Sequence, residues 1–259
     1  MRRKILIFLL ASLVVCLFAL TTLAQVEEQK EQLFVIDEWV VKPPMADEFE
    51  AVVKEAIAIY AEHKFPYPFY TFWSSDFHYN IMWPYEKYGD LDNWYKDIEE
   101  LSKKVGEPWQ DLNKRAVVTY EYTYSSVYYS MPELSYTPEN PRLKPDEANF
   151  FFFDIYYVQP GKTKEFKEII KKFVALAKSK NITEGWEAYD GDIGTDMPVY
   201  AFVMRAKDEA DFYIHNTKMW EILGEEGEKL WEESVALIRK REERQAWFLP
   251  DLSYIPKEK

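Results

Sequence analysis

The sequence predicts an α+β protein made of two similar halves, each with the element order strand, helix, two strands, helix, strand. Segments about 117 residues apart resemble each other along most of the chain. Aromatic and β-branched runs alternate with segments whose apolar residues recur every three or four positions, as in helices that bury one face. With 259 residues, 47% of them apolar, the chain is long enough to bury one or two cores, which excludes disorder and a small disulfide scaffold.

The internal repeat is visible at both ends of each half. Residues 33–37 (LFVID) align with residues 150–154 (FFFFD), and residues 131–138 (MPELSYTP) align with residues 249–256 (LPDLSYIP). Matches of this length in a nearly fixed register indicate duplication of one unit. We therefore expect a first unit over residues 32–138, a charged and proline-containing linker over 139–149, and a second unit over 150–256.

The first strand and helix of each half follow from local patterns. Residues 150–158 are aromatic and β-branched, as in a strand, and Pro160-Gly161 ends them as a turn. A helix follows from Thr163, which is a suitable N-cap residue, and its apolar residues lie on one face while its lysines lie on the other. Residues 47–63 predict the corresponding helix of the first half.

The rest of the second half predicts a hairpin and a second helix. Residues 186–190 and 199–205 predict the two hairpin strands, which flank a segment containing glycine and proline. Asp208 begins a helical pattern that runs through residue 223, and residues 228–243 continue it.

Local propensity and the repeat disagree about the end of each half. Residues 119–124 alternate tyrosine with threonine or glutamate, which is typical of a strand. The corresponding residues 237–242 are mostly charged, which is typical of a helix. The repeat then predicts a helix that runs to about Ser125, with the last strands at residues 127–131 and 245–249.

Each half therefore predicts a four-stranded antiparallel sheet with helices on one face. The uncovered faces of the two sheets can be buried against each other, so we expect the sheets to pack face to face within one chain. Because this pairing takes place inside one molecule, we expect a monomer.

The N-terminal segment has the three parts of a secretory signal peptide. Basic residues 2–4 precede an apolar run over residues 5–20, and small residues precede a cleavage site after Ala24. Cleavage over residues 1–24 predicts an exported protein, periplasmic or extracellular, and an uncleaved membrane anchor is the alternative. Removal of three basic residues changes the formal net charge from −13 to −16, which disfavours nucleic acid and anionic membranes as partners. The single cysteine, Cys16, lies in this segment, so the mature chain has no thiol chemistry.

The chain resembles the dimeric α+β barrel superfamily and, within it, the tandem NIPSNAP-like proteins. The resemblance rests on the first-strand pattern followed by Pro160-Gly161-Lys162, the helix over residues 164–177, the stretch 210–212 (ADF) and the terminal residues 252–256 (LSYIP). It implies two ferredoxin-like units that form an α+β barrel within the chain. The activity stays open, because this superfamily includes cofactor-free monooxygenases, heme-degrading enzymes and chlorite dismutase relatives.

The resemblance does not carry a heme site over to this chain. In the heme-degrading branch an asparagine on the first strand and a tryptophan and a histidine on the second helix form the site. The matching positions hold other residue types, namely Asp154, His215 and Glu225 in the second half and Asp37, Asp97 and Glu107 in the first. We therefore predict no cofactor.

Candidate site residues are carboxylates, histidines and aromatic side chains expected between each sheet and its helices. Asp37 and Asp154 occupy equivalent places on the two first strands, where burial raises the pKa of a carboxylate and lets it act as a base. The alternative is that each aspartate accepts only structural hydrogen bonds. His78 and His215 are candidate pocket bases or ordinary surface histidines. The full candidate pocket set is Asp37, His78, Trp83, Asp154, His215, Asn216 and Trp220.

Spacing argues against common metal and nucleotide chemistry. No two histidines lie four residues apart on a predicted helix, so we predict no metal site, and no phosphate-binding loop, nucleophile elbow or Cys-x-x-Cys motif is present. The aromatic residues concentrated over 65–95 suit a core, or a pocket for a planar or sugar-like ligand.

Three functions fit these features. The leading hypothesis is a protein that binds an apolar or aromatic small molecule. The alternatives are a cofactor-independent monooxygenase, with an aspartate or His215 as base, and a non-catalytic structural or interaction protein.

Overall fold

The computed structural model describes residues 31–257, so the predicted signal peptide lies outside the described residues. The helices are α2 (Ala46–His63), α3 (Gly89–Val105), α4 (Glu107–Ala116), α5 (Thr163–Ser179) and α6 (Glu209–Val235), and the strands are β1 (Leu33–Val41), β2 (Tyr70–Ser74), β3 (His78–Tyr85), β4 (Tyr120–Ser130), β5 (Phe150–Val158), β6 (Trp186–Gly191), β7 (Val199–Ala206) and β8 (Ile238–Phe248). Short 3₁₀ turns occupy Pro43–Met45, Pro132–Leu134, Pro145–Glu147 and Pro250–Leu252.

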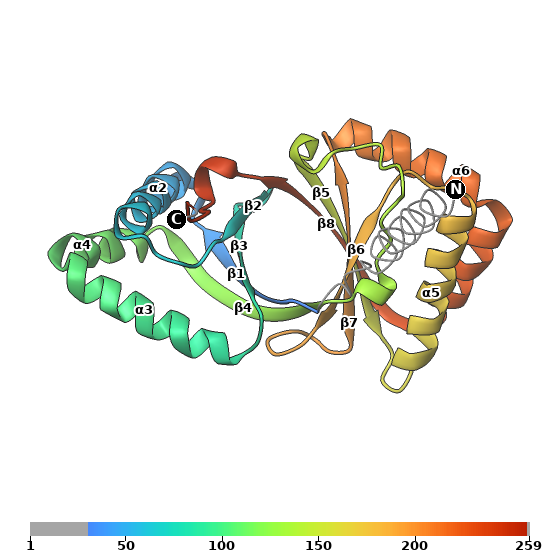
Figure 1. Ribbon diagram of the computed structural model, residues 1–259, viewed down its shortest axis with the longest axis horizontal. Coiled ribbons are helices and arrows are strands. Elements are labelled where there is room, and N and C mark those ends of the chain that lie inside the picture. Colours follow the sequence, from blue (N-terminus) through green and yellow to red (C-terminus); the bar gives the residue numbers. More distant parts are fainter. Residues whose placement is uncertain (1–30, 258–259) are drawn as a thin grey trace, which may run out of the picture. The chain divides into compact units, whose positions relative to one another are not determined.

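The strands form one closed antiparallel barrel in the order β1-β3-β2-β8-β5-β7-β6-β4 (Figure 1). β1 pairs with β3 and β4, and β5 pairs with β7 and β8 in the same way. The pairing pattern of the first four strands therefore recurs in the last four. Contacts of β2 with β8 and of β4 with β6 close the barrel. The α+β class and the barrel expected from the sequence are confirmed.

Alternation along the strands separates a helix-facing side from the barrel interior. On β1, Leu33 and Trp39 pack with residues of the covering helices, so Asp37 lies on the same helix-facing side and Glu38 points the opposite way. Inside the barrel, Ile155 of β5 packs in a cluster with Tyr128 of β4, a strand from across the barrel. Each sheet thus has a helix-covered face and a face that lines the interior.

The helices pack differently over the two sheets. α5 and α6 lie side by side, whereas α2 and α3 diverge from each other and both contact α4 (Figure 1). Many apolar side chains between α2, α3 and the first sheet are buried, whereas others, among them Val35 and Trp94, are only partly buried.

The last strand of each half begins earlier than the repeat predicts. α4 ends at Ala116 and β4 begins at Tyr120, so the predicted helix to Ser125 is wrong and the strand propensity of residues 119–124 was the correct signal. β8 likewise begins at Ile238 instead of residue 245. Both strands pair along nearly their whole length with β1 or β5, and the charged side chains of β8 are largely exposed, which a strand tolerates as well as a helix does.

The helix starts are only partly as expected. Asp208 caps α6, because its side chain accepts a hydrogen bond from the Asp211 amide at 2.8 Å. Thr163 is not the cap of α5; it is the first helical residue, and Lys162 precedes it without a side-chain cap. Among the helices of residues 31–257, none combines the length and the apolar character needed to cross a bilayer.

Candidate functional site

Asp37 lies on the helix-facing side of β1 without a cation beside it among the described residues. Its Oδ1 accepts a hydrogen bond from the Ser125 hydroxyl of β4 at 2.5 Å. Burial raises the pKa of Asp37, while hydrogen bonding by Ser125 and by the indole of Trp83 partly offsets this effect. A half-buried carboxylate with a raised pKa can take up a proton from a bound molecule.

Asp154, the equivalent residue of β5, has a different environment. The Arg241 guanidinium donates to both of its carboxylate oxygens, at 2.7 and 2.8 Å, and the Tyr156 hydroxyl donates to it as well. The Asp154 side chain is 9% exposed. A two-pronged ion pair of this kind fixes the carboxylate and occupies its hydrogen-bonding capacity. Asp154 is therefore a structural residue, whereas Asp37 keeps capacity for a ligand.

Side-chain size also distinguishes the two halves. In the second half the Phe152 ring stacks on Phe212 of α6 with centroids 4.4 Å apart. In the first half, Val35 aligns with Phe152, and each is the third residue of its strand. Trp94 of α3 aligns with Phe212. Valine occupies less volume than phenylalanine, whereas tryptophan occupies more, so the two halves fill this layer with different side chains.

Two buried indole donors lie in the first half without a partner. Within residues 31–257, Trp39 Nε1 and Trp94 Nε1 are the buried side-chain polar atoms that make no hydrogen bond. Buried donors are normally paired, so these two indoles offer hydrogen bonds to a molecule that enters this layer. Trp94 also contacts the Trp83 ring edge to face, with centroids 5.5 Å apart.

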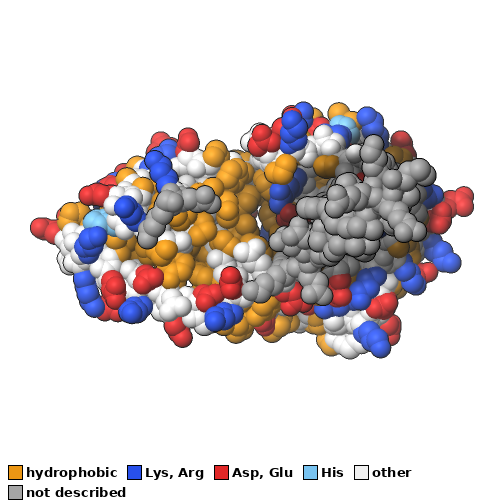
Figure 2. All heavy atoms as spheres, viewed as in Figure 1, with side chains coloured by type: hydrophobic (Ala, Val, Ile, Leu, Met, Phe, Trp, Pro, Cys, Tyr) orange, Lys and Arg blue, Asp and Glu red, His pale blue; other side chains and the backbone are white. Residues whose placement is uncertain are grey.

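We use the name first-half groove for the cluster of Val35, Asp37, Trp83, Tyr85 and Trp94 between the first sheet and its helices. Figure 2 shows hydrophobic side chains gathered in the left half of the view, between the positions of α2 and α3 and the first sheet in Figure 1. Burial raises the pKa of Tyr85. The groove thus has an aromatic wall and one carboxylate.

Tyrosines at the edge of this region are fixed by acidic residues. The Tyr67 hydroxyl donates to Asp97 at 2.8 Å, and burial together with this contact raises the pKa of Tyr67 to about 12. The Tyr88 hydroxyl donates to Asp192 at 2.8 Å. Because Asp192 belongs to the loop between β6 and β7, the second half contributes to the edge of the first-half groove.

The same loop holds the strand that carries Ser125. The Val127 amide donates to the Ile193 carbonyl at 2.9 Å, and the Asp192 amide donates to the Val127 carbonyl at 2.8 Å. Gly194 has a φ of +81°, and a Cβ added there would approach the Ser125 carbonyl oxygen to 2.3 Å. Glycine is therefore required for the loop to lie this close to Ser125.

His78 lies on the opposite face of the first sheet from Asp37. Its Nδ1 contacts the Glu38 carboxylate, and its Nε2 lies 3.6 Å from Asp76. These three residues line a cavity of about 540 Å³ beside β8, on a different side of the sheet from the groove. His78 is therefore not a base for a ligand at Asp37.

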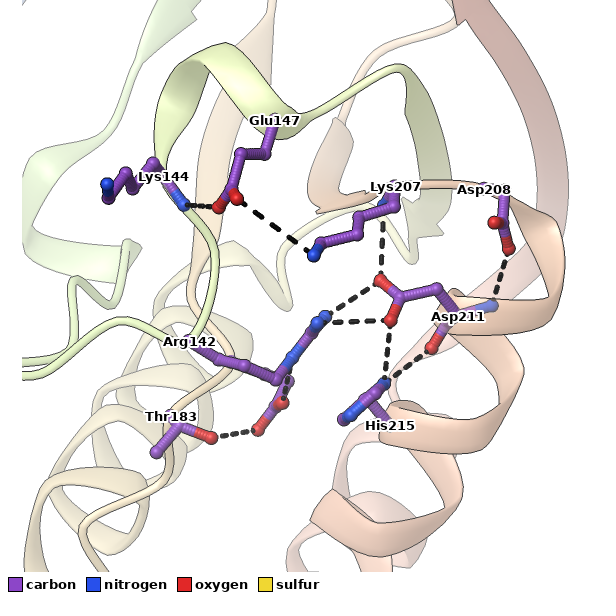
Figure 3. Close-up of polar contacts among 9 residues, drawn as sticks. Arg142, Lys144, Glu147, Thr183, Lys207, Asp208, Asp211 and His215 are labelled. Atoms are coloured by element: carbon purple, nitrogen blue, oxygen red, sulfur yellow. Dashed lines mark hydrogen bonds and ion pairs between the residues drawn. The ribbon is translucent and has the colours of Figure 1, made fainter.

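His215 belongs to a cluster of ion pairs that anchors the segment between the two halves (Figure 3). Arg142 of that segment donates to both oxygens of Asp211, at 3.1 and 3.0 Å, and to Glu184 at 3.0 Å. His215 Nδ1 lies 2.8 Å from the Asp211 carbonyl oxygen and 3.2 Å from its carboxylate. The structure thus gives His215 a structural partner and does not bring it to Asp154.

Of the remaining candidates, Trp220 is a core residue. Its ring packs against Phe173 of α5 and Trp231, with centroid distances of 6.1 and 6.3 Å. Asn216 lies half-buried on α6, and no hydrogen bond of its side chain is found among the described residues. The predicted pocket set is thus dispersed, and only Asp37 and Trp83 lie together.

The sequence analysis missed Val35, Trp94, Ser125 and Gly194. Val35 and Trp94 could have been found by asking where the two halves differ in side-chain volume at aligned positions. No local pattern singles out Ser125 or Gly194, because their importance comes from contacts between distant segments.

The described residues do not fit a histidine-ligated heme. The positions that match the iron-ligating histidine hold Glu107 and Glu225, and both side chains are exposed. Among residues 31–257, no group of three or more histidine, cysteine, aspartate or glutamate side chains is arranged to hold a metal ion.

Comparison with solved structures identifies the fold. The chain is similar to an anthrone oxidase-like protein (TM-score 0.56, 11% identity, 86% of this chain and 92% of the other). It is also similar to a candidate monooxygenase from Lactobacillus acidophilus (TM-score 0.53, 10% identity, 87% and 96%) and to a variant of chlorite dismutase from Candidatus Nitrospira defluvii (TM-score 0.51, 8% identity, 85% and 92%). These likenesses show the dimeric α+β barrel fold. No protein-family profile and no curated protein sequence matches the chain.

Proposed function

We propose that the protein binds a planar aromatic or otherwise apolar small molecule in the first-half groove. A ligand with one hydroxyl group suits the site best, because its O–H can donate to the Asp37 carboxylate while its oxygen accepts from the free indole N–H of Trp94. The remaining surface of such a ligand would lie on aromatic side chains.

The observation that carries this proposal is the difference between the two aligned aspartates. Asp154 is neutralised by Arg241, whereas the polar partners of Asp37 within residues 31–257 are a serine and an indole. A buried carboxylate without a cation costs stability. The presence of such a carboxylate at Asp37, beneath the diverging helices α2 and α3, supports a role of Asp37 in ligand binding rather than in packing.

Equilibrium dialysis with 6-bromo-2-naphthol tests this proposal. Val35→Phe gives the first half the side chain that Phe152 has at the aligned position of the second half. We expect this variant to bind the ligand more weakly by at least about tenfold, or about 1.4 kcal/mol. Asp37→Asn should also weaken binding, whereas Asp154→Asn is the matched control and should leave it unchanged. Equal affinity of the wild type and Val35→Phe would exclude the groove.

A second candidate function is oxygenation of an electron-rich substrate without a cofactor. Its specific support is the raised pKa of Asp37, which makes this carboxylate a stronger base than an ordinary aspartate. With anthrone, Asp37 would accept a proton from the methylene carbon, and the carbanion would react with O₂. One oxygen atom becomes the new carbonyl of anthraquinone and the other leaves as water, so the substrate is oxidised while O₂ is reduced.

Oxygen uptake with anthrone tests this second function. We expect a protein-dependent rate that rises with pH through the raised pKa of Asp37, because the ionised form is the base. The rate should fall to the uncatalysed level in Asp37→Asn and persist in Asp154→Asn. Binding without oxygen uptake would leave the protein a binding module.

We also propose the finer architecture expected from the sequence. The recurring strand pairing supports two ferredoxin-like units over residues 32–138 and 150–256, joined by 139–149, as in the NIPSNAP-like arrangement. Closure of the barrel within one chain supports a monomer, which sedimentation would test. Export after cleavage at Ala24 rests on residues 1–24 alone, and N-terminal sequencing of the mature protein would test it.

A further inference from the structure

A cavity of about 540 Å³ lies where the barrel wall separates between β2 and β8. β8 pairs with β2 only at Trp247 and Phe248, whereas its pairing with β5 begins at Ile238. Within the described part of the chain, the edge of β8 that faces β2 is therefore unpaired over most of its length. Side chains from both faces of β8 reach the cavity, with Arg244 on the barrel side and Gln245 on the helix side.

Unequal loops explain why this junction is open while the other is closed. At the junction of β4 and β6, the seven-residue loop over 192–198 continues along β4 and hydrogen-bonds to it. At the junction of β2 and β8, the corresponding turn over 75–77 has three residues, and within residues 31–257 none of its backbone groups hydrogen-bonds to β8. The short turn therefore does not cover the cavity as the loop over 192–198 covers the other junction.

The charged groups on the cavity wall already have partners. Arg244 lies 3.6 Å from Glu38 and donates to Glu242 at 3.3 Å, and Glu243 lies 2.7 Å from Arg241. A cationic ligand would compete with the Arg244 guanidinium for these carboxylates, and an anionic ligand would meet the carboxylates directly. A neutral ligand avoids both costs.

The cavity has hydrogen-bonding capacity that the protein does not use. Among the described residues, the hydroxyls of Ser74 and Ser75 make no hydrogen bond, and each carboxylate on the wall keeps further acceptor positions. One wall is aromatic, because Phe152 and Tyr213 line it and Tyr213 is 47% exposed. Many donors and acceptors beside an aromatic surface suit a molecule with several hydroxyl groups and one apolar face.

We propose that this cavity binds a neutral, multiply hydroxylated molecule of the size of a mono- or disaccharide. Its hydroxyls would bond to the serines and to the carboxylate wall, and its apolar face would lie on Tyr213. This site is separate from the first-half groove, and its occupation does not require the function proposed there.

Saturation-transfer NMR with maltose tests the proposal, with glucosamine and glucuronate as cationic and anionic comparison ligands. We expect transfer to maltose, and Tyr213→Ala should weaken its binding by about tenfold because the aromatic surface is lost. Tyr122→Ala removes a tyrosine of similar exposure on β4 and is the matched control, with no expected effect. Ser74→Phe should abolish binding by filling the cavity.

The outcomes separate this site from the groove. Maltose binding that survives Val35→Phe and Asp37→Asn but not Tyr213→Ala supports the cavity. Absence of transfer to maltose, equal binding by Tyr213→Ala and the wild type, or salt-sensitive binding of only glucosamine or glucuronate would each overturn the proposal.

Discussion

Gly194 of the loop between β6 and β7 lies directly against the backbone of Ser125, the residue that hydrogen-bonds to Asp37. A Cβ at position 194 would come within 2.3 Å of the Ser125 carbonyl oxygen, and the Ser125 hydroxyl lies 2.5 Å from the Asp37 carboxylate. A loop of the second half therefore supports the carboxylate of the first, which makes the first-half groove a product of both halves.

Gly194→Ala should displace Ser125 and weaken its hydrogen bond to Asp37. We expect a loss of about 2 kcal/mol in the free energy of unfolding. We also expect a further rise in the pKa of Asp37, which NMR titration of its carboxyl group would measure. Gly161→Ala is the matched control, because Gly161 has the same φ of +81° with no atom within 4 Å of its added Cβ. Equal losses in both variants would mean that backbone strain alone matters.

Asp37→Asn should stabilise the protein at neutral pH. Because the folded-state pKa of Asp37 is raised, its contribution to stability is fully present below its usual value of 3.8 and is lost as the pH rises through the folded-state value. Denaturant unfolding between pH 3 and pH 8 should therefore show a smaller decline for the variant than for the wild type. If the free energy of unfolding depended on pH identically in the wild type and in Asp37→Asn, the raised pKa of Asp37 would be contradicted.

Asp154→Asn should have the opposite effect on stability. Arg241 would lose its two-pronged partner, and the Tyr156 hydroxyl would lose the carboxylate to which it donates. We expect a loss of about 2 kcal/mol, measured by denaturant unfolding at pH 7. Glu243→Gln removes the other, 50% exposed carboxylate beside Arg241 and should cost less than about 1 kcal/mol. If Glu243→Gln lowered the free energy of unfolding more than Asp154→Asn does, Glu243 and not Asp154 would be the main partner of Arg241.

Arg142→Gln should loosen the segment between the two halves. Burial acts to raise the pKa of Asp211, but hydrogen bonds from the Lys207 amide and from Arg142 outweigh it, so the pKa is lowered. The associated stability is present above the unfolded-state pKa and is lost as the pH falls through the folded-state value. We expect faster proteolysis within residues 139–148 and a weaker dependence of stability on acid pH.

Arg115→Gln is the matched control for that experiment. It removes a guanidinium that pairs with Glu48 and Glu55 at the surface, where its side chain is 44% exposed. Proteolysis of residues 139–148 should be unchanged in this variant. Similar cleavage rates in Arg142→Gln and Arg115→Gln would show that the ion-pair cluster does not hold the segment.

Sequence reasoning reached the fold class because strand pairing repeats with the sequence repeat. It failed at residues 119–124, where alignment with a charged segment outweighed strand propensity, although both segments are strands. A partly solvated strand can carry charges, so charge alone does not distinguish it from a helix. Strand pairing with β1 and β5 decided the conformation, and that information is not local.

The candidate site was predicted only in part for a related reason. The sequence singled out Asp37 and Trp83 because a carboxylate and a large aromatic side chain among apolar strand residues are chemically distinctive, and the structure brings these two residues together. His78 lies on the opposite face of the sheet from Asp37, because neighbouring residues of a strand alternate in direction, and it lines the cavity beside β8 instead. His215 pairs with Asp211, which is in turn bound by Arg142 of the segment between the halves. Residue type predicted chemistry, while strand register and remote contacts decided where that chemistry lies.

The central claim is that the first-half groove, and not its counterpart in the second half, holds an aromatic ligand. A crystal grown with 6-bromo-2-naphthol would locate the ligand by the anomalous signal of bromine. We expect one peak between the first sheet and the diverging helices α2 and α3, with the naphthol oxygen beside Asp37. A peak between the second sheet and α5 and α6, or no peak in the groove at saturating ligand, would contradict the account.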